Sequence, residues 1–250
     1  MGRSLKKAIQ EQKLELERLQ AEKMLERAPM GKVEVNSPLA QAVVGMRRSG
    51  KSVVCRKAMS DSSVAYGYVD FDDEVLAKID ASELDDVLQA VYEVYGNVDH
   101  FLFDEIQNVE GWHLFVNRLL RVGKHVVITG SNARLLTGDL ATHLTGRHVP
   151  ISVFPFSYAE YCAWNGGDSE AAWKKYLFNG GLPETFALSD QRGYVSALYN
   201  SILSKDILGR RKVRNAQRFI DAAYVLMQQF SREVSYDGLA RKAGISSAHT

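Results

Sequence analysis

The sequence predicts a three-layer α/β fold with a central, mostly parallel sheet, followed by a smaller all-α module. Short apolar runs alternate with segments of helical periodicity from Leu39 to about Ser157, which is typical of successive strand–helix–strand units. After Tyr158 the strand pattern fades and helical segments dominate. Because 46% of the 250 residues are hydrophobic, the chain can bury a substantial core.

The first predicted element is a helix over residues 5–28. This segment contains no Gly or Pro and is rich in Glu, Lys, Gln and Leu, and Pro29 is expected to end it. One leucine stripe suits a surface helix that packs on the domain. A dimerising coiled coil is the alternative, although few heptads support it. We treat residues 1–30 as a separate N-terminal helix.

Five apolar runs are predicted to form the strands of the sheet. Two of them end in acidic residues, and a third ends in a polar tip. Between the runs, apolar residues recur at helical spacing, as at Leu84, Val87, Leu88 and Val91. The predicted strands lie within 39–45, 64–73, 100–107, 125–131 and 148–157, and the helices between them within 51–59, 83–96 and 111–123.

A domain boundary is expected beyond the last strand. Gly180, Gly181 and Pro183 mark a linker-like break between the α/β region and the helical region. We expect the α/β domain to span residues 31–165. A helical lid and a truncated, winged-helix-like module with a helix-turn-helix pattern are then expected to span residues 166–250.

The composition excludes several classes of protein. The formal net charge is +1, so overall charge names no partner. Cys55 and Cys162 are far apart and lie in no metal-type spacing, which argues against a disulfide framework and fits a reducing compartment. No His or Cys cluster suggests a metal centre. Without an apolar signal region or a run of roughly 18 apolar residues, the protein is expected to be cytoplasmic and not bound to a membrane.

The segment VVGMRRSGKS, residues 43–52, contains the pattern G-x-x-x-x-G-K-[ST] between a predicted strand and a predicted helix. Gly45 and Gly50 let the backbone turn tightly and approach a phosphate, while N–H groups at the helix start point at the anion. Lys51 brings a charge to the β- and γ-phosphates, and Ser52 offers a hydroxyl to Mg²⁺. The pattern therefore predicts a phosphate-binding loop.

Acidic residues end two of the predicted strands. Asp104 is expected to hold Mg²⁺ through water, and Glu105 to polarise an attacking water, which favours hydrolysis over transfer to another acceptor. The alternative is a pair of solvated acids. Asp70, Asp72 and Asp73 close the preceding strand, and they either approach the same site or remain solvated loop acids.

The sequence assigns Ser49 to the phosphate loop. It leaves the roles of several other polar residues open. Arg47 and Arg48 either lie along the phosphates or only decorate the loop. Ser131 or Asn132 is expected to place a polar group near the γ-phosphate or the attacking water, where it would sense the nucleotide; the alternative for Ser131 is a capping or turn role. Arg147 either reaches a γ-phosphate, in its own subunit or a neighbour's, or forms an ion pair at a strand start.

Together these motifs resemble the prokaryotic AAA-type P-loop ATPases, which carry G-x-R-R-x-G-K-[ST], FLDEIQN, TGSxA-LL and L-x-GR…PFSFxEY. The corresponding segments are GMRRSGKS, FLFDEIQNVEGW, TGSNARLL, LTGRHVPISVFPFSYAEY, GGLPE and SKDI. Order and spacing agree from about Gln41 to Leu208, and Met46 stands where a proline or valine is commoner. Such ATPases often carry a C-terminal domain of unknown function that is related to nuclease folds.

The resemblance implies a P-loop NTPase, AAA-like sheet with an extra strand between the loop strand and the acid strand, and it implies ATP and Mg²⁺ as ligands. By position, Lys51 and Ser52 match the family's phosphate-loop residues, and Asp104–Glu105 match its acid pair. Ser131 matches the sensor, and Arg147 matches a finger-like arginine. Homo-oligomerisation remains open.

The C-terminal sequence predicts part of a helix-turn-helix. Ser235 can cap a first helix, and Gly244 can make the turn. Ser246 can cap a second helix, which the chain end at Thr250 interrupts. We therefore expect the sequence to represent either part of a longer gene or a gene that was shortened naturally. The basic run over residues 209–218 either contacts nucleic-acid phosphates or is solvated. This pattern does not establish DNA recognition by itself.

We therefore expect an ATPase that couples Mg²⁺-dependent hydrolysis of ATP to a conformational change in the helical C-terminal part. A nucleotide-gated DNA-binding switch with little turnover is the alternative from another class. A small-molecule kinase fits poorly, because the sequence shows no acceptor pocket or cluster of lid arginines.

Overall fold

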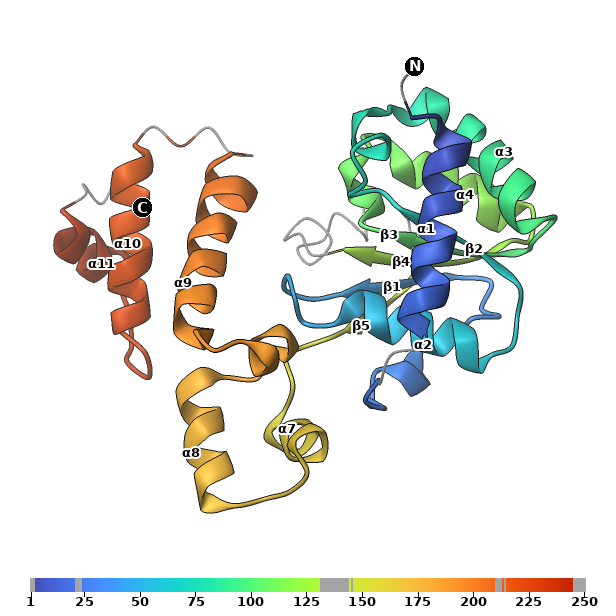
Figure 1. Cartoon of the computed structure of the whole chain (residues 1–250). Coiled ribbons are helices and arrows are strands. Elements are labelled where there is room, and N and C mark those ends of the chain that lie inside the picture. Colours follow the sequence, from blue (N-terminus) through green and yellow to red (C-terminus); the bar gives the residue numbers. More distant parts are fainter. Residues whose placement is uncertain are drawn as a thin grey trace. The chain divides into compact units, whose positions relative to one another are not determined.

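The structure is a computed structural model of the chain, and it describes residues 3–20, 24–130, 144, 146–209, 213 and 215–244. The chain divides into two compact units, Met1–Ala187 and Leu188–Thr250. The first unit carries the sheet, and the regular elements of the second are helices over its described residues (Figure 1). Among the described helices, none is both long enough and apolar enough to cross a membrane.

Five parallel strands form the sheet in the order β2-β3-β4-β1-β5. The predicted α/β fold with a central parallel sheet is confirmed. Strand β4 lies between the loop strand β1 and the acid strand β3, as the resemblance implied. The strands are β1 (Ala40–Val44), β2 (Tyr66–Asp70), β3 (His100–Asp104), β4 (His125–Gly130) and β5 (His148–Ser152).

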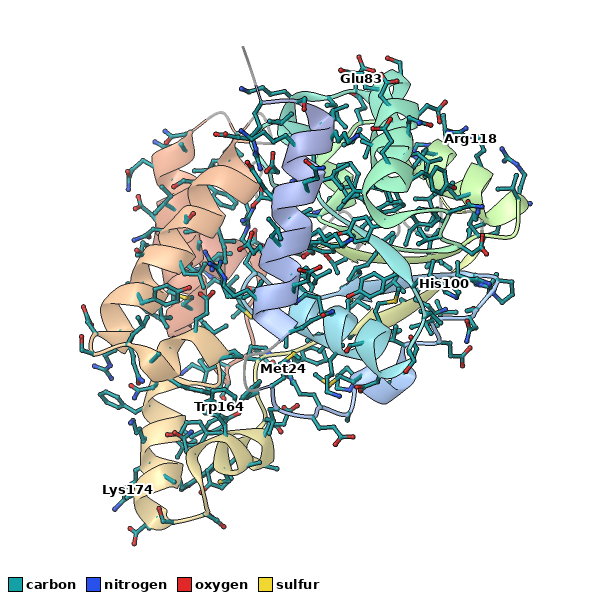
Figure 2. The ribbon with its side chains drawn as sticks, turned by 45° about the vertical axis from the view of Figure 1, so that its right-hand side comes forward. Met24, Glu83, His100, Arg118, Trp164 and Lys174 are labelled. Carbon is teal, nitrogen blue, oxygen red and sulfur yellow. The ribbon has the colours of Figure 1, made fainter. Side chains whose placement is uncertain are left out.

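Helices cover both faces of the sheet, which explains why its strands are continuous apolar runs rather than alternating ones. In β3, Phe101 and Phe103 belong to the core beneath α3 and α4, whereas Leu102 belongs to the core beneath α2. Figure 1 shows α3 and α4 on one side of the sheet and α2 on the other, and Figure 2 shows side chains filling both layers. The helices are α2 (Lys51–Asp61), α3 (Leu84–Tyr95) and α4 (Trp112–Arg121).

Helix α1 (Leu5–Gln20) crosses the outer edge of the sheet at β2. Ile9 belongs to the core under α3 and α4, and Leu16 belongs to the core under α2. Between them, the Gln12 amide donates to the Asp70 carbonyl and accepts from the Asp70 N–H, both at 3.0 Å. One side chain thus satisfies backbone groups that an edge strand leaves unpaired, and the helix is part of the first unit.

The predicted extent of this helix is wrong at its C-terminal end. We expected a helix to residue 28, but α1 ends at Gln20 and residues 24–28 lie outside any helix. Favourable helix propensity is overridden here by tertiary contacts, because the segment runs beside the phosphate loop and places Arg27 against Ser49.

The segment after β5 contains α7 (Tyr158–Asn165), α8 (Glu170–Asn179) and the short 3₁₀ helix Pro183–Ala187. The double glycine between the last two was expected to be linker-like. Instead, the Gly181 carbonyl accepts from the Phe156 N–H at 2.7 Å, and a Cβ at Gly181 would come within 2.1 Å of the Phe156 carbonyl. The glycine permits close packing, and the boundary between the two units falls later, after Ala187.

The second unit contains α9 (Gln191–Ser201), the π-helical segment Ile202–Leu208, α10 (Ala216–Gln228) and α11 (Tyr236–Ala243). The Ser235 hydroxyl accepts from the Gly238 N–H at 3.1 Å, and Gly244 follows α11 with a φ of 65°, so the predicted cap and turn are both present. The second predicted helix, from Ser246, lies outside the described residues, as does much of the basic run.

Candidate functional site

The phosphate loop joins the end of β1 to the first residue of α2. A Cβ at Gly45 would come within 2.1 Å of the Val153 carbonyl oxygen, so no other residue fits there without backbone movement. Gly50 precedes α2 with a φ of 91°, a left-handed conformation that glycine adopts without steric cost. Both glycines of the sequence pattern are therefore required by the backbone itself.

Lys51 extends from the start of α2 into the loop and is only 5% exposed. Its Nζ donates to the Met46 carbonyl at 3.1 Å and lies 4.0 Å from a carboxylate oxygen of Glu105. Burial lowers the pKa of Lys51, while the charges of Glu105 and Asp104 oppose that shift. The loop lysine and the acid pair, which are distant in sequence, thus share one site.

Asp104 is the buried centre of the acid pair. Its carboxylate accepts from the hydroxyls of Thr129 and Ser52, and from the Tyr68 hydroxyl at 3.5 Å. Burial raises the pKa of Asp104, although the bonds from Thr129 and Ser52 favour its charged form. The two residues proposed from the sequence to hold a metal, Ser52 and Asp104, are therefore in direct contact.

Glu105 adopts a left-handed backbone conformation, with a φ of 51° and a ψ of 34°. This conformation is uncommon outside glycine and is sustained by the surrounding contacts. The Glu105 N–H donates to the Thr129 hydroxyl at 3.1 Å, and its carboxylate accepts from the Gln107 amide. Thr129 therefore contacts both members of the acid pair, a role that was not assigned to it from the sequence.

The three acids at the end of β2 and just after it, Asp70, Asp72 and Asp73, differ in burial and in their contacts. Asp70 lies opposite Asp104 in the register of β2 and β3, and burial together with the Asp104 charge raises the pKa of Asp70 to about 7. Asp73 instead forms an ion pair with Arg3 at 2.7 Å, and Asp72 is exposed. Only Asp70 approaches the site, so the interpretation as solvated loop acids is wrong for Asp70 and holds for Asp72.

The remaining loop residues differ in how deeply they are buried and in which groups they contact. Arg48 has a φ of 65°, is exposed, and donates to Glu184 at 2.5 Å. Arg47 is half-buried, and its charge contributes to the lowered pKa of Lys51. Ser49 is fully buried, and its hydroxyl has no hydrogen-bond partner among the described residues. An unpaired buried hydroxyl suits a loop that takes up a polar ligand.

Arg147 does not join this site within its own chain. Its carbonyl accepts from the Ala40 N–H at 3.0 Å, and His148 pairs with Ala40 at the amino end of β1. The whole of β1 separates this position from the loop, and its five residues alone span about 13 Å at the usual rise of a strand. A role toward a neighbouring copy stays a prediction, and Ser131 and Asn132 lie outside the described residues.

Comparison with known protein families identifies the first unit. The model of a family described as AAA domain matches residues 37–162, half of the chain. The chain belongs to the AAA domain family. A second model, a domain of unknown function (DUF8612), matches residues 170–250. The resemblance inferred from the motifs, including the C-terminal domain of unknown function, is confirmed.

Two curated relatives of this AAA domain protein are described as uncharacterized proteins. The protein MJ1544 of Methanocaldococcus jannaschii is 28% identical over 219 residues, covering 80% of this chain and 49% of the relative. A protein of Haemophilus influenzae is 33% identical over 190 residues, covering 70% and 48%. The chain therefore spans about half the length of the curated relatives it matches.

Similar solved structures include a Walker-type ATPase, PABY2304 of Pyrococcus abyssi, and AMPPCP-bound DnaA from Aquifex aeolicus. The first is 16% identical with a TM-score of 0.42, covering 83% of this chain and 77% of the other. The second is 12% identical with a TM-score of 0.43, covering 84% and 77%.

Among the described residues, cavities lie on two sides of the phosphate loop of the AAA domain. The first, of about 200 Å³, lies between the acid pair and α1. It brings Ser52, Asp70 and Asp104 together with polar residues of α1 and α2. Its lining consists of Gln12, Glu15, Leu16, Leu19, Ser52, Arg56, Tyr68, Asp70 and Asp104.

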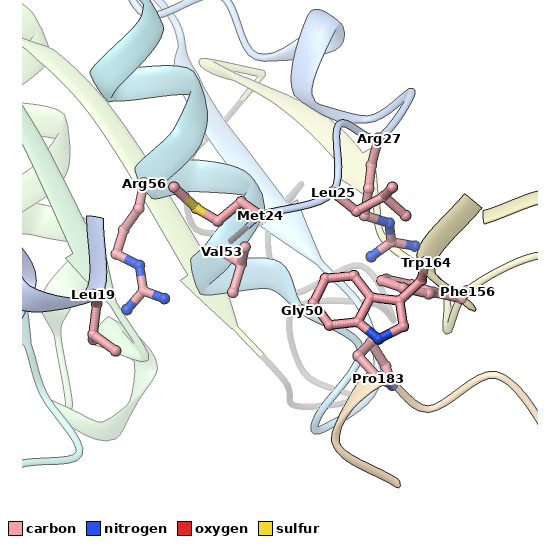
Figure 3. Close-up of a pocket in the computed structure, with 10 residues that line it drawn as sticks. All are labelled: Leu19, Met24, Leu25, Arg27, Gly50, Val53, Arg56, Phe156, Trp164 and Pro183. Carbon is pink, nitrogen blue, oxygen red and sulfur yellow. The ribbon is translucent and has the colours of Figure 1, made fainter. Parts of the chain in front are cut away.

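The second cavity, of about 130 Å³, lies beside Gly50 and is mostly apolar (Figure 3). The Trp164 indole, the Phe156 ring and Pro183 gather at one end of it, and Leu19 and Arg56 lie at the other. Its full lining consists of Leu19, Met24, Leu25, Arg27, Gly50, Val53, Arg56, Phe156, Trp164 and Pro183. Apolar walls beside a phosphate loop suit the planar base of a nucleotide.

The donor set fits a magnesium ion that a nucleotide brings with it. In the described part of the chain, no three His, Cys, Asp or Glu residues gather as a metal site. Mg²⁺ is usually held by one or two side chains together with phosphate oxygens and water. The Ser52 hydroxyl and the Asp104 carboxylate, already in contact, provide such a pair.

Proposed function

We propose that this chain binds ATP with Mg²⁺, hydrolyses it, and couples turnover to a conformational change in the helical C-terminal part. The observation that carries the proposal is the 4.0 Å approach of Lys51 Nζ to the Glu105 carboxylate, beside the buried Asp104. Lys51 can bind phosphate oxygens, Asp104 can hold a metal ion and Glu105 can orient water. The three side chains lie together in one site. Membership of the AAA domain family supports the same assignment.

Each residue has a defined role in the proposal. Lys51 and the loop N–H groups bind the phosphates, and the bond from Lys51 to the Met46 carbonyl is exchanged for bonds to phosphate oxygens. Ser52 and Asp104 hold Mg²⁺, which neutralises charge on the phosphate oxygens when bound. Glu105 accepts a proton from the attacking water, and Thr129 keeps its backbone in position.

The base is proposed to occupy the apolar cavity beside Gly50. Leu25 and Val53 line its walls, and Trp164 offers an aromatic surface on which a base can stack (Figure 3). The cavity of about 130 Å³ adjoins the loop at Gly50. In this proposal the base and the phosphates bind side by side. The choice of ATP over another nucleotide is also part of the proposal.

Phosphate release from ATP tests the proposal. The purified chain with Mg²⁺ should release phosphate, and Glu105→Gln should lower turnover roughly 100-fold or more, the usual size of general-base catalysis. Glu110→Gln, which changes an exposed glutamate on the same segment, is the matched control and should leave turnover unchanged. Full turnover by the Glu105→Gln variant would remove this glutamate from the mechanism.

A DNA-binding switch with little turnover is the second candidate, and the capped helix α11 with its left-handed glycine turn favours it. Fluorescence anisotropy with duplex DNA, with and without ATP at two salt concentrations, separates the two functions. Salt-dependent binding that ATP changes would support the switch, because contacts to phosphate backbones weaken as salt rises. Absence of binding at modest ionic strength would dismiss it.

A further inference from the structure

Arg27 lies between α1 and β1 and is almost completely buried, with 6% of its surface exposed. Its guanidinium donates to the Ser49 carbonyl and the Phe154 carbonyl, each at 2.8 Å, and to the Glu160 carboxylate at 2.7 Å. The guanidinium carbon also lies 4.7 Å from the centroid of the Phe156 ring. The phosphate loop, the end of β5 and α7 therefore meet at one side chain.

The contact with Ser49 constrains the geometry of the phosphate loop. A trans peptide is planar, with its C=O and N–H on opposite sides, so holding the Ser49 carbonyl toward Arg27 turns the Gly50 N–H away from Arg27. A Cβ at Gly50 would come within 3.3 Å of Arg27 Nη1, so the glycine lets the guanidinium approach closely. Arg27 thus determines the orientation of the peptide between Ser49 and Gly50.

We infer that Arg27 is a positioning residue, which keeps the phosphate loop in the conformation that presents N–H groups to phosphates; this inference rests on the proposed nucleotide function. Without the guanidinium, the buried Ser49 carbonyl loses its donor, and buried carbonyls are rarely left unpaired. The peptide would then rotate toward another partner. A rotated peptide turns an oxygen, rather than an N–H, toward a bound anion, which lowers affinity for phosphate.

Glu160 keeps the guanidinium in place and attaches α7 to the loop. Its carboxylate also accepts from the Ser157 N–H at 2.8 Å, as part of the capping box that begins α7. Burial alone would raise the pKa of Glu160, but the bonds from Arg27 and Ser157 outweigh it and lower the pKa. The carboxylate is therefore charged at neutral pH, and the ion pair connects α7 to the phosphate loop.

Affinity for ATP and for inorganic tripolyphosphate, both measured by competition with a fluorescent ATP analogue, tests the inference. Arg27→Met should weaken both ligands by roughly tenfold or more, and Arg27→Lys should not rescue binding, because one ammonium cannot reach three separated acceptors. Glu160→Gln should weaken both by only a few-fold, since Gln preserves the capping box and Arg27 keeps its bond to Ser49. Thermal unfolding midpoints are recorded in parallel.

The matched control is Arg3→Met, which removes another ion pair of the first unit, between Arg3 and Asp73 at 2.7 Å. It should lower the unfolding midpoint without changing either affinity. Wild-type affinities for both ligands in a folded Arg27→Met variant would overturn the inference. A loss of affinity for ATP but not for tripolyphosphate would also overturn it, because Arg27 would then act on the base rather than on the phosphates. If that variant does not fold, Arg27→Lys and Glu160→Gln are judged by the same outcomes. A wild-type chain that binds neither ligand would instead overturn the proposed function, and the inference with it.

Discussion

The carboxyl and amino ends of the parallel sheet contain different kinds of residues. At the carboxyl end, Lys51 and Asp104 are each only 5% exposed, so two opposite charges are buried close together. Two non-glycine residues with positive φ angles, Arg48 (65°) and Glu105 (51°), lie at the same end, whereas one, Ser63 (57°), precedes β2 at the amino end. Burying charge and adopting uncommon backbone conformations both oppose folding, so this end is arranged for something other than stability.

At the amino end, charged side chains lie at or near the surface, where the half-buried Lys124 pairs with the exposed Asp99 at 2.6 Å. The His100 ring stacks on the His125 ring with centroids 4.6 Å apart. The His100 ring also bonds to the Asn36 side chain at 2.8 Å, and the His125 ring bonds to the Ser37 carbonyl at 2.9 Å. Arg147 at this end is exposed. The comparison agrees with the general rule that parallel sheets bind ligands at the carboxyl ends of their strands.

Replacing Lys51 is the strongest test of the difference between the two ends of the sheet. Lys51→Met should weaken ATP binding by roughly 10- to 100-fold, corresponding to about 1.5–3 kcal/mol for a hydrogen bond to a charged group. The ligand-free variant should be as stable as the wild type or more so, because burial already disfavours the charged lysine, whose pKa is lowered. Isothermal titration and urea unfolding measure the two effects.

Lys57→Met is the matched control for this substitution. Lys57 lies on the same helix, where it pairs with Asp61 one turn away, and its replacement should leave ATP affinity unchanged. A large loss of stability in ligand-free Lys51→Met would contradict the view that this lysine serves binding at the expense of folding.

Replacing Thr129 tests how far the acid pair at the end of β3 depends on the neighbouring strand β4. Thr129→Val preserves the shape of the side chain but removes the hydroxyl that donates to Asp104 and accepts from the Glu105 N–H. We expect a loss of about 1–3 kcal/mol in the free energy of unfolding, and a turnover roughly tenfold lower. Thr185→Val, at another fully buried threonine, should lower stability without the same loss of turnover.

Much of the fold and the centre of the site could be predicted because their signals are local. The apolar runs and the glycine pattern specify β1, the loop and α2 within a few residues, and acids at the end of an apolar run identify Asp104 and Glu105. Parallel strands bring their carboxyl ends to one edge of the sheet. The meeting of Lys51 with Glu105 follows from those two facts.

Other site residues could not be predicted because their roles arise from packing between distant segments. Thr129 contacts both acids because β4 is the strand next to β3, and strand order is not a local property of a sequence. For Asp70 the sequence left two alternatives open, and the register of β2 and β3, which brings it to Asp104, decides between them. Arg27 reaches the phosphate loop because the chain leaves its helical pattern early, against the local propensity that predicted a helix to residue 28.

A pH titration tests the amino end, where smaller effects are expected. Burial, followed by the charge of His125, lowers the pKa of His100, the residue labelled at the end of its strand in Figure 2. The unfolded chain therefore binds protons more readily than the folded chain near the ordinary histidine pKa of about 6.5, and stability should fall as pH drops through that value.

Urea unfolding at pH 8 and pH 5.5 measures this effect. His100→Gln should reduce the loss of stability on acidification, whereas His113→Gln, on α4 and outside the stacked pair, should not. Nucleotide affinity at pH 8 should be the same in both variants. An equal pH dependence in His100→Gln and the wild type would remove the stacked pair from the explanation.

Arg147→Ala should have the smallest effect on a single chain, because the register of β5 places this residue at the end of β1 remote from the phosphate loop. ATP affinity should be unchanged at dilute protein concentration. If a neighbouring copy uses Arg147 to stabilise charge during hydrolysis, turnover per chain should instead rise with protein concentration in the wild type and not in the variant. Reduced ATP affinity in dilute Arg147→Ala would mean that the two ends of the sheet are coupled within one chain, and the contrast between them would no longer hold.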